Sequence, residues 1–390
     1  MKIRAFITHK LSERYSDCQD RFCINEKDCR ISVSDGMSQS VFPDYWAEIL
    51  SQHYAKEGHC TDEDRKELCK KWMEYVVHYI NQEINKGKTP WRLQNCIESQ
   101  NGAGATICGV QFRNAKEWQG QVLGDSCVIE VDNVYGIKIH TSEEKAFDSY
   151  PDYYESFPAK VGRGTIKDIS GEISNSNFLL LVSDPFSEFL FNNKEKCIKW
   201  LDRIRGLKSH EEYCSLVDDW REEGLHNDDS TLCIVEYDGS DKFNIDVQDD
   251  INNLIVKEND MLKQSDAEIK AESEDTVTPE DIGQEGYKQI EQKSILSGDE
   301  NTSVDNSEGK RQKFSSETRN SSESHEITDD FATWIKERGN IIKNNGKQKA
   351  KSHKLKRRGS NPNIGVNEFD NFCQEVIEYV RKIIKRIKEE

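Results

Sequence analysis

The stretch RISVSDGM, residues 30–37, holds a β-prone run that stops abruptly at an aspartate. The residues before the stop, 28–34, have the β-branched side chains and the length of a strand. Asp35 and Gly36 then end the run, and small polar residues follow. Asp and Gly are ordinary turn residues. Whether this strand end is more than a turn depends on how other strands of the chain end.

Four further segments place an aspartate directly beside a β run. For any one of them a turn or a helix cap is a sufficient explanation. Five such segments together favour carboxylates that converge at the ends of adjacent strands, where their repulsion requires a cation. Oxygen ligands without His or Cys select hard ions such as Mg²⁺ or Mn²⁺, and two such ions can activate a water and clamp a phosphoryl group. The four segments are CQDRF with Asp20, QVLGDSCVIE with Asp125, LLLVSDPF with Asp184, and HNDDSTLCIV with Asp228 and Asp229.

Residues 1–240 contain more strand-like runs than helix-like runs, and the strands come in hairpin-like pairs. This pattern predicts an α+β fold with a mainly antiparallel β-sheet core and flanking helices. The strand candidates are 2–8, 28–34, 105–113, 118–123, 126–131, 134–139, 178–183 and 231–237, and the helix candidates are 44–56, 62–85, 186–203 and 210–222.

Charge divides the 390 residues into parts of different character. The formal charge of −18 is spread as −12 over 1–240, −14 over 241–330 and +8 over 331–390. We expect a folded domain at 1–240 and an acidic, largely disordered linker at 241–330, because that stretch has too little apolar surface to offset ordering entropy. A basic segment at 331–366 and an amphipathic C-terminal helix at 367–390 follow.

The basic segment and the last helix each leave two interpretations open. The run 343–358 has eight Lys or Arg and no acid. It could bind nucleic acid or anionic lipid, but it has no aromatic residue for base stacking, which favours a solvated spacer and makes nucleic acid unlikely. Apolar residues from Phe369 to Ile387 form a heptad seam that is short for an autonomous coiled coil. That helix could dock on a protein partner or self-associate.

Cysteine usage and the hydropathy of the chain indicate a cytoplasmic protein. Twelve scattered cysteines without a CxxC pair are typical of reduced thiols. We expect no signal peptide and no membrane span, because no apolar run is long enough. The cluster His53, His59, Cys60 and Cys69 has no paired zinc spacing, so placement on a helix surface and in the core is favoured.

In order and local character, the aspartate segments resemble the metal-dependent protein Ser/Thr phosphatases of type 2C, in their bacterial form. The resemblance covers residues 1–240 and does not extend to the tail. It implies two packed antiparallel sheets with helices outside and a metal site at one end. The matching motifs are Gln19-Asp20, Asp35-Gly36-Met37, Gly104-Ala105-Thr106, Gly124-Asp125-Ser126, Ser183-Asp184-Pro185 and Asp228-Asp229.

The resemblance also implies a set of metal ligands. Asp35 would bridge two Mg²⁺ or Mn²⁺ ions, and the Gly36 carbonyl would bind one of them. Asp184 and Asp228 would complete the other ion, and Asp125 would bind a third, weaker one.

The remaining roles that the resemblance implies concern the water and its supports. Asp20 would hold metal-bound water and orient it for attack on a phosphoserine or phosphothreonine, without a phosphoenzyme. Thr106 and Asp229 would support the site. The partners would be phosphoproteins, including a Ser/Thr kinase or its targets.

Two departures from the family pattern favour an alternative. Many relatives have a phosphate-binding arginine where this chain has Tyr15, so Arg14 is the candidate for phosphate binding, with His9 and Lys10 on the same approach. Pro185 replaces a glycine after the aspartate. The alternative is a catalytically weak or inactive phosphatase-like binding or scaffold protein whose tail recruits a partner.

Overall fold

The computed structural model describes residues 1–88, 90–134, 136–143, 151–157, 162–193, 198–274 and 378. The chain forms two compact units, one made of Met1–Glu258 with Arg358–Glu390 and the other of Asn259–Arg357. All of the sheets lie within the first unit. Of the second unit, the structure describes the later part of helix α7 (Ile251–Glu274).

The first sheet has six strands in the order β13-β1-β12-β11-β7-β8. Neighbours are antiparallel except β13 and β1, which run parallel with a register shift between Ile3 and Arg4. The central strands are apolar on both faces, because this sheet is covered on both sides. The strands are β1 (Lys2–Thr8), β7 (Cys127–Asp132), β8 (Ile137–His140), β11 (Asn177–Val182), β12 (Ser230–Glu236) and β13 (Asn244–Gln248).

The second sheet has five antiparallel strands in the order β10-β6-β5-β3-β2. A short two-stranded sheet, β4 (Gly104–Ala105) with β9 (Tyr154–Glu155), lies beside the end of β3, where Gly36 bridges to Ala105. The five strands are β2 (Arg21–Asn25), β3 (Arg30–Ser34), β5 (Ile107–Phe112), β6 (Glu117–Leu123) and β10 (Lys167–Glu172).

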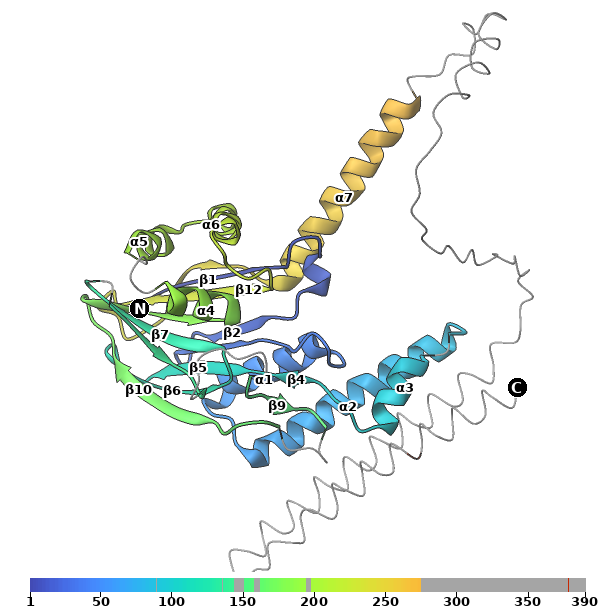
Figure 1. Cartoon of the computed structure of the whole chain (residues 1–390), viewed down its shortest axis with the longest axis horizontal. Helices are drawn as coiled ribbons and strands as arrows, with labels where there is room; N and C mark the ends of the chain where they lie inside the picture. The colour runs from blue at the N-terminus through green and yellow to red at the C-terminus, as the bar shows by residue number, and fades with distance from the viewer. Residues whose placement is uncertain are drawn as a thin grey trace, which may run out of the picture. The chain divides into compact units, whose positions relative to one another are not determined.

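The two sheets form the middle layers of the domain, and helices cover their outer faces (Figure 1). One core lies between the sheets and includes Val33, Val110 and Leu181. A second core joins the first sheet to α4 (Asp184–Asn192), α5 (Ile198–Gly206) and α6 (His210–Glu222). On the other side, α1 (Pro43–Glu57) contacts β2 and β3, α2 (Asp62–Asn85) packs on α1, and α3 (Trp91–Glu98) follows.

The connection between α1 and α2 has well-defined caps. Gly58 ends α1 with a φ of +80°, in the left-handed region where glycine carries no steric penalty. Thr61 then opens α2 with a capping box: its side chain accepts from the amide of Asp64, and the Asp64 carboxylate accepts from the amide of Thr61. These caps fix the short loop between the two helices.

The predicted α+β fold, with an antiparallel sandwich and flanking helices, is confirmed. One domain limit is wrong: the sheet continues beyond residue 240 into β13, and α7 follows, so this part of the predicted linker is ordered. Ile245 and Val247 of β13 alternate with polar residues and pack toward the cores, which the acidic composition of the stretch conceals. The predicted helix 186–203 is two helices, α4 and α5.

Most of the predicted tail lies outside the described residues. This holds for the linker from 275 to 330 and for the basic segment 331–366. In the predicted helix 367–390 only Glu378 is described, and it is helical.

The described part of the chain contains ten free cysteines and no disulfide. Six of the ten are buried, and they occupy different layers: Cys108 and Cys233 lie between the sheets, Cys127 lies under α4 to α6, and Cys69 lies on α2. Among the described residues, no helix combines the length and the apolar character that a membrane span requires.

Candidate metal centre

Asp35 leaves the end of β3 in a position fixed by two hydrogen bonds to Thr106, which lies between β4 and β5. Its amide donates to Thr106 Oγ1 at 3.2 Å, and its carbonyl accepts from the Thr106 amide at 2.9 Å. A Cβ on the next residue, Gly36, would lie 2.6 Å from the carbonyl oxygen of Pro43, where α1 begins. Only glycine therefore fits between the strand end and the helix.

Asp184 and Asp20 meet the end of β12 from two sides. Asp184 is the first residue of α4, directly after the N-cap Ser183. Ser183 Oγ accepts from the Thr231 amide at 2.9 Å, and Thr231 Oγ1 donates to Asp20 Oδ2 at 2.7 Å. Thr231 thus joins the start of α4 to the turn before β2 and orients the fully buried Asp20.

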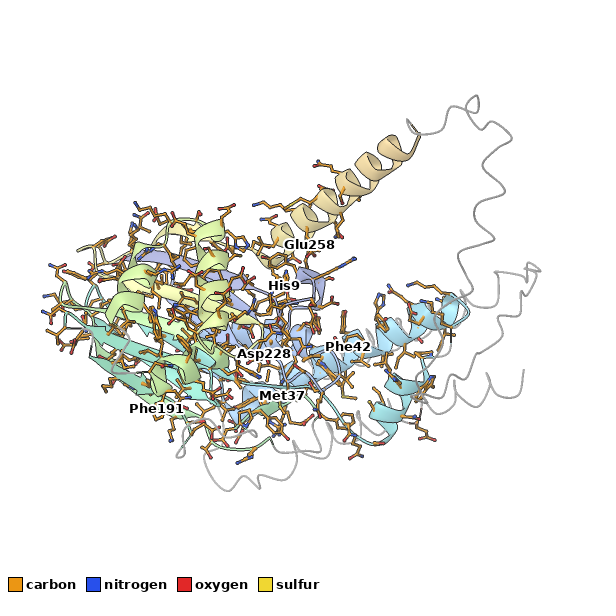
Figure 2. All side chains as sticks on the ribbon, turned by 45° about the horizontal axis from the view of Figure 1, so that its top comes forward. His9, Met37, Phe42, Phe191, Asp228 and Glu258 are labelled. Carbon is orange, nitrogen blue, oxygen red and sulfur yellow. The ribbon has the colours of Figure 1, made fainter. Side chains whose placement is uncertain are left out.

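Asp229 and Asp228 open β12 and have different tasks. Asp229 is buried, and its two oxygens accept from the amides of Lys10 at 3.0 Å and Gln19 at 2.7 Å. Asp228 Oδ1 pairs with Lys10 Nζ at 2.9 Å, and the same ammonium donates to Ser38 Oγ at 2.9 Å. In the view of Figure 2, Asp228 lies between His9 and Met37. Asp229 thus links the start of β12 to the backbone of Lys10 and Gln19, whereas the Asp228 side chain pairs with an ammonium group.

The electrostatics show that five carboxylates share one region. Burial raises the pKa of Asp35 well above its usual range, and the charges of Asp20, Asp184, Asp125 and Asp228 raise it further. Burial also raises the pKa of Asp184, with the charges of Asp125, Asp228 and Asp20 adding to the effect. Repulsion of this kind requires charges within several ångströms of one another. The strand and turn ends therefore bring these side chains together.

Two of the carboxylates have pKa values near neutrality. Burial, followed by the charge of Asp229, raises the pKa of Asp20 to about 7. Burial raises the pKa of Asp125 to about 7, with Glu143 and Asp228 contributing. In the absence of a cation, protons can therefore partly neutralise the cluster.

Three oxygens of the cluster are buried without a hydrogen-bond partner in the described part of the chain: Asp20 Oδ1, Asp125 Oδ1 and Asp184 Oδ1. A buried acceptor without a donor is costly, and a carboxylate more so. Orphaned oxygens on buried acids are the donor set that a hard divalent cation satisfies. By this criterion the residues fit Mg²⁺ or Mn²⁺.

The geometry sets one limit on that fit. Among the described residues, no three of these aspartates bring oxygens within 4.8 Å of one another, and the group that does so is His53, His59 and Asp64. Each ion of the aspartate cluster would therefore draw only a few ligands from side chains and the rest from backbone and water.

The residues proposed for phosphate binding lie differently. Arg14 is exposed and lies just before a 3₁₀ turn (Tyr15–Asp17). Among the described residues, its side chain makes no hydrogen bond or ion pair with the aspartates. The phenol of Tyr15 bonds to His210 Nε2 at 2.7 Å, on α6. Lys10, by contrast, is at the cluster, and its partner Asp228 and the other nearby acids raise its pKa to about 12 against the effect of burial.

The sequence reasoning missed two supporting residues. Arg221 of α6 donates to the carbonyls of His9 at 2.9 Å and Asp228 at 3.1 Å, and so joins the ends of β1 and β12. Thr231 is the other. The sequence does offer a signal for Thr231, because Ser230 and Thr231 are hydroxyl residues between the aspartate pair and the apolar run that follows. It offers none for Arg221, which is one arginine among several on a helix.

No model of a known protein family matches the chain, and no curated protein matches it in sequence. Solved structures similar to it include bacterial Ser/Thr phosphatases, the family that the motifs resemble. Stp1 from Staphylococcus aureus is 14% identical with a TM-score of 0.39, over 61% of this chain and 95% of that one. The catalytic domain of PstP, solved with two manganese ions, is 12% identical with a TM-score of 0.37, over 60% and 96%. The S. agalactiae enzyme is 14% identical with a TM-score of 0.37, over 60% and 100%. Because identities and scores are this low, the function has to be judged from the chain's own residues.

Proposed function

We propose that this protein hydrolyses phosphoserine and phosphothreonine in phosphoproteins at a metal centre built from the aspartate cluster. The observation that supports this most is that three carboxylates beside strand ends, those of Asp20, Asp125 and Asp184, each have a buried oxygen without a hydrogen-bond partner among the described residues. Repelling acids of this kind destabilise the fold unless they serve to bind cations. The substrate proteins would include a Ser/Thr kinase or its targets, in the cytoplasm.

In this proposal the aspartates divide the ligation of two Mg²⁺ or Mn²⁺ ions. Asp35 would bridge both ions, and the Gly36 carbonyl would contact one of them. Asp184 and Asp228 would hold the other, and Asp125 would hold a third. When bound, such ions supply Lewis acidity that activates water and neutralises the charge of the phosphoryl group.

Asp20 would orient the attacking water. Its Oδ2 is fixed by the hydroxyl of Thr231, and its Oδ1 is buried without a partner among the described residues. One oxygen of the carboxylate is thus anchored while the other is free to accept a hydrogen bond from water. A fixed acceptor limits the water to the direction of attack, which is how positioning accelerates a reaction.

Lys10 would contact the phosphate in the place of the family's arginine. Its ammonium already lies beside Asp228 and Ser38, and its side chain retains 14% exposure, so it lies at the rim of the cluster. Arg14, the first candidate from the sequence, is exposed on the loop that follows Lys10 and would be a second contact. A single ammonium gives a point charge without the bidentate geometry of a guanidinium.

The test is hydrolysis of p-nitrophenyl phosphate and of a phosphothreonine peptide with Mn²⁺. Asp35→Asn and Asp184→Asn should lose the activity, whereas Asp246→Asn, a surface control on β13 that pairs with Lys2, should retain it. Full rates in Asp35→Asn and Asp184→Asn would exclude this centre as the catalytic site.

The bond of Tyr15 to His210 supports the alternative of a phosphatase-like binding protein, because this phenol is engaged away from the aspartates. Calorimetry with Mn²⁺ and a phosphopeptide, run beside the rate assay, separates the two. Binding of both without turnover would favour the binding protein. A pull-down with residues 331–390 then tests whether the tail recruits a partner.

A further inference from the structure

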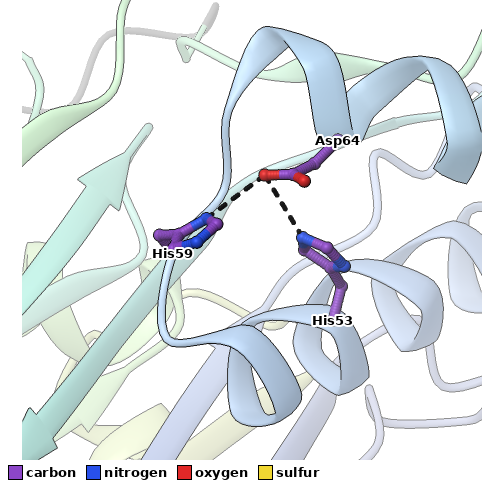
Figure 3. A group of neighbouring side chains, drawn as sticks. All are labelled: His53, His59 and Asp64. Atoms are coloured by element: carbon purple, nitrogen blue, oxygen red, sulfur yellow. Dashed lines mark hydrogen bonds and ion pairs between the residues drawn. The ribbon is translucent and has the colours of Figure 1, made fainter. Parts of the chain in front are cut away.

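A second group of cation-binding side chains lies in the loop between α1 and α2. His53 is on the last turns of α1, His59 follows the helix, and Asp64 is in the first turn of α2. One ligand atom from each lies within 4.8 Å of the other two. Figure 3 shows both imidazoles directed at the Asp64 carboxylate, with His53 Nε2 at 3.5 Å and His59 Nδ1 at 3.2 Å from Oδ2.

This group is separate from the aspartate cluster. Helix α1 starts at Pro43, against Gly36, and at 1.5 Å per residue His53 lies about 15 Å further along its axis. The far end of α1 is tied to the opposite end of the β2–β3 hairpin, because Asn25 donates to the Ala55 carbonyl at 2.9 Å. The two groups therefore lie at opposite ends of the same helix.

The donors are chemically unlike the oxygen-only cluster. Two imidazole nitrogens and one carboxylate suit zinc and similar divalent transition metals rather than Mg²⁺. His53 Nε2 is buried without a hydrogen-bond partner in the described structure, although Asp64 lies just beyond bonding distance.

The carboxylate is held in place before any metal arrives. Asp64 Oδ2 accepts from the Thr61 amide at 2.9 Å and from Thr61 Oγ1 at 2.7 Å, as part of the capping box. Gly58 turns the chain so that His59 comes back over the start of α2. His59 is half-exposed, so water can complete the coordination. The Asp64 side of the site is therefore preorganised, and the His59 side is open to solvent.

We propose that His53, His59 and Asp64 bind one divalent transition-metal ion of the zinc type, which links the end of α1 to the start of α2. Without metal, Thr61 and His59 Nδ1 hold the Asp64 carboxylate, so the arrangement persists in both states. A bound ion stabilises the fold by mass action, because the three ligands come together only when both helices are formed.

The test uses the full chain, stripped with a chelator and then saturated with Mg²⁺ to fill oxygen sites. Zn²⁺ is titrated by calorimetry, and the thermal midpoint is followed in parallel. The wild type should bind one Zn²⁺, and its midpoint should rise with Zn²⁺ concentration. His53→Gln and His59→Gln should each weaken binding by more than about 100-fold, because losing even a partner of a ligand costs about 10- to 100-fold.

Two controls make the result specific. His78→Gln changes another histidine, on α2, that bonds to Gln82 outside the group, and it should bind like the wild type. Asp35→Asn should keep this Zn²⁺ site while losing phosphatase activity, so failure here is distinguishable from failure of the proposed function. Because His59 is half-exposed, His59→Gln should fold with an unchanged metal-free midpoint. Wild-type Zn²⁺ affinity in both histidine variants, or no Zn²⁺ binding by the wild type, would overturn the proposal.

Discussion

The two ends of α1 handle charge in opposite ways. At its start, five aspartates gather beside Gly36, and several of their oxygens have no donor among the described residues. At its end, Asp64 Oδ2 accepts from the amide and the hydroxyl of Thr61 and lies within hydrogen-bond distance of His59 Nδ1. The first group is costly without a cation, whereas the Asp64 carboxylate of the second already has hydrogen-bond partners. We therefore expect the aspartate cluster to need a bound metal for stability, whereas the His53–His59–Asp64 group is stable with or without one.

The largest expected effect is that of Asp35→Asn. We expect kcat/KM with Mn²⁺ to fall by at least about 100-fold, which corresponds to about 3 kcal/mol of lost transition-state stabilisation. Stability in chelator should change in the opposite direction, because the variant removes one repelling charge from the cluster. Rate assays and thermal melts of the same preparation measure both. Loss of stability together with activity would contradict the view that repulsion between the aspartates destabilises the metal-free fold.

His53→Gln is the matched change at the other end of the helix. It should leave the phosphatase rate unchanged, since His53 is about 15 Å along α1 from the aspartates. A fall in rate comparable to that of Asp35→Asn would mean that the two ends are not independent.

The pH dependence of metal-free stability is the next effect. The pKa values of Asp20 and Asp125 are raised to about 7 in the fold, from a usual value of 3.8. Between these values the folded state binds more protons than the unfolded state, so stability falls as pH rises. The contribution is full below about pH 4 and is lost as the pH rises through about 7. Thermal midpoints in chelator should be lower at about pH 8 than at about pH 5.5.

Saturating Mn²⁺ should reverse that dependence, because protons then compete with the ion for the same oxygens. Equal slopes with and without Mn²⁺ would mean that the ion binds elsewhere.

Lys10→Met should have an intermediate effect. The change removes the ammonium that pairs with Asp228 at 2.9 Å. We expect KM for the phosphopeptide to rise about tenfold with a smaller change in kcat, which is the loss of one hydrogen bond to a charged group, about 1.5 kcal/mol. Lys138→Met, which removes a surface pair with Glu130, is the matched control. A fall in kcat at constant KM would assign Lys10 to the chemical step instead.

Thr61→Ala should have the smallest effect. Loss of the N-cap hydroxyl costs about 1 kcal/mol of stability, measurable by denaturant unfolding. The same change frees the Asp64 carboxylate and should weaken Zn²⁺ binding by about tenfold, while phosphatase activity stays constant. Unchanged Zn²⁺ affinity would show that the capping box does not orient the ligand.

The sequence predicted those elements whose own residues bury apolar surface. β3, β11 and β12 are apolar runs, and α2 has a helical stripe of apolar residues, so all four were found close to their limits. β10 was missed, because its exposed sequence KDISGE becomes a strand only through pairing with β6. Local sequence does not encode that pairing.

The candidate sites show the same division. The aspartates were visible because each follows or precedes a strand. Lys10 was noted only as lying on the approach, since its pairing with Asp228 depends on β1 and β12 being neighbours. The histidines were considered together with Cys60 and Cys69, but the fold buries those cysteines and brings Asp64 to the histidines instead.

The buried thiols can report on local unfolding of the molecule. Burial raises the pKa of Cys69 to about 12, and it also raises the pKa values of Cys108, Cys127 and Cys233. Only the thiolate is alkylated, so each of these residues reacts when the layer around it separates. Pulsed labelling followed by peptide mapping would therefore time the separation of the two sheets, of the first sheet from its helices, and of α2 from β9, where Cys69 Sγ contacts the Glu155 carbonyl, without any introduced probe.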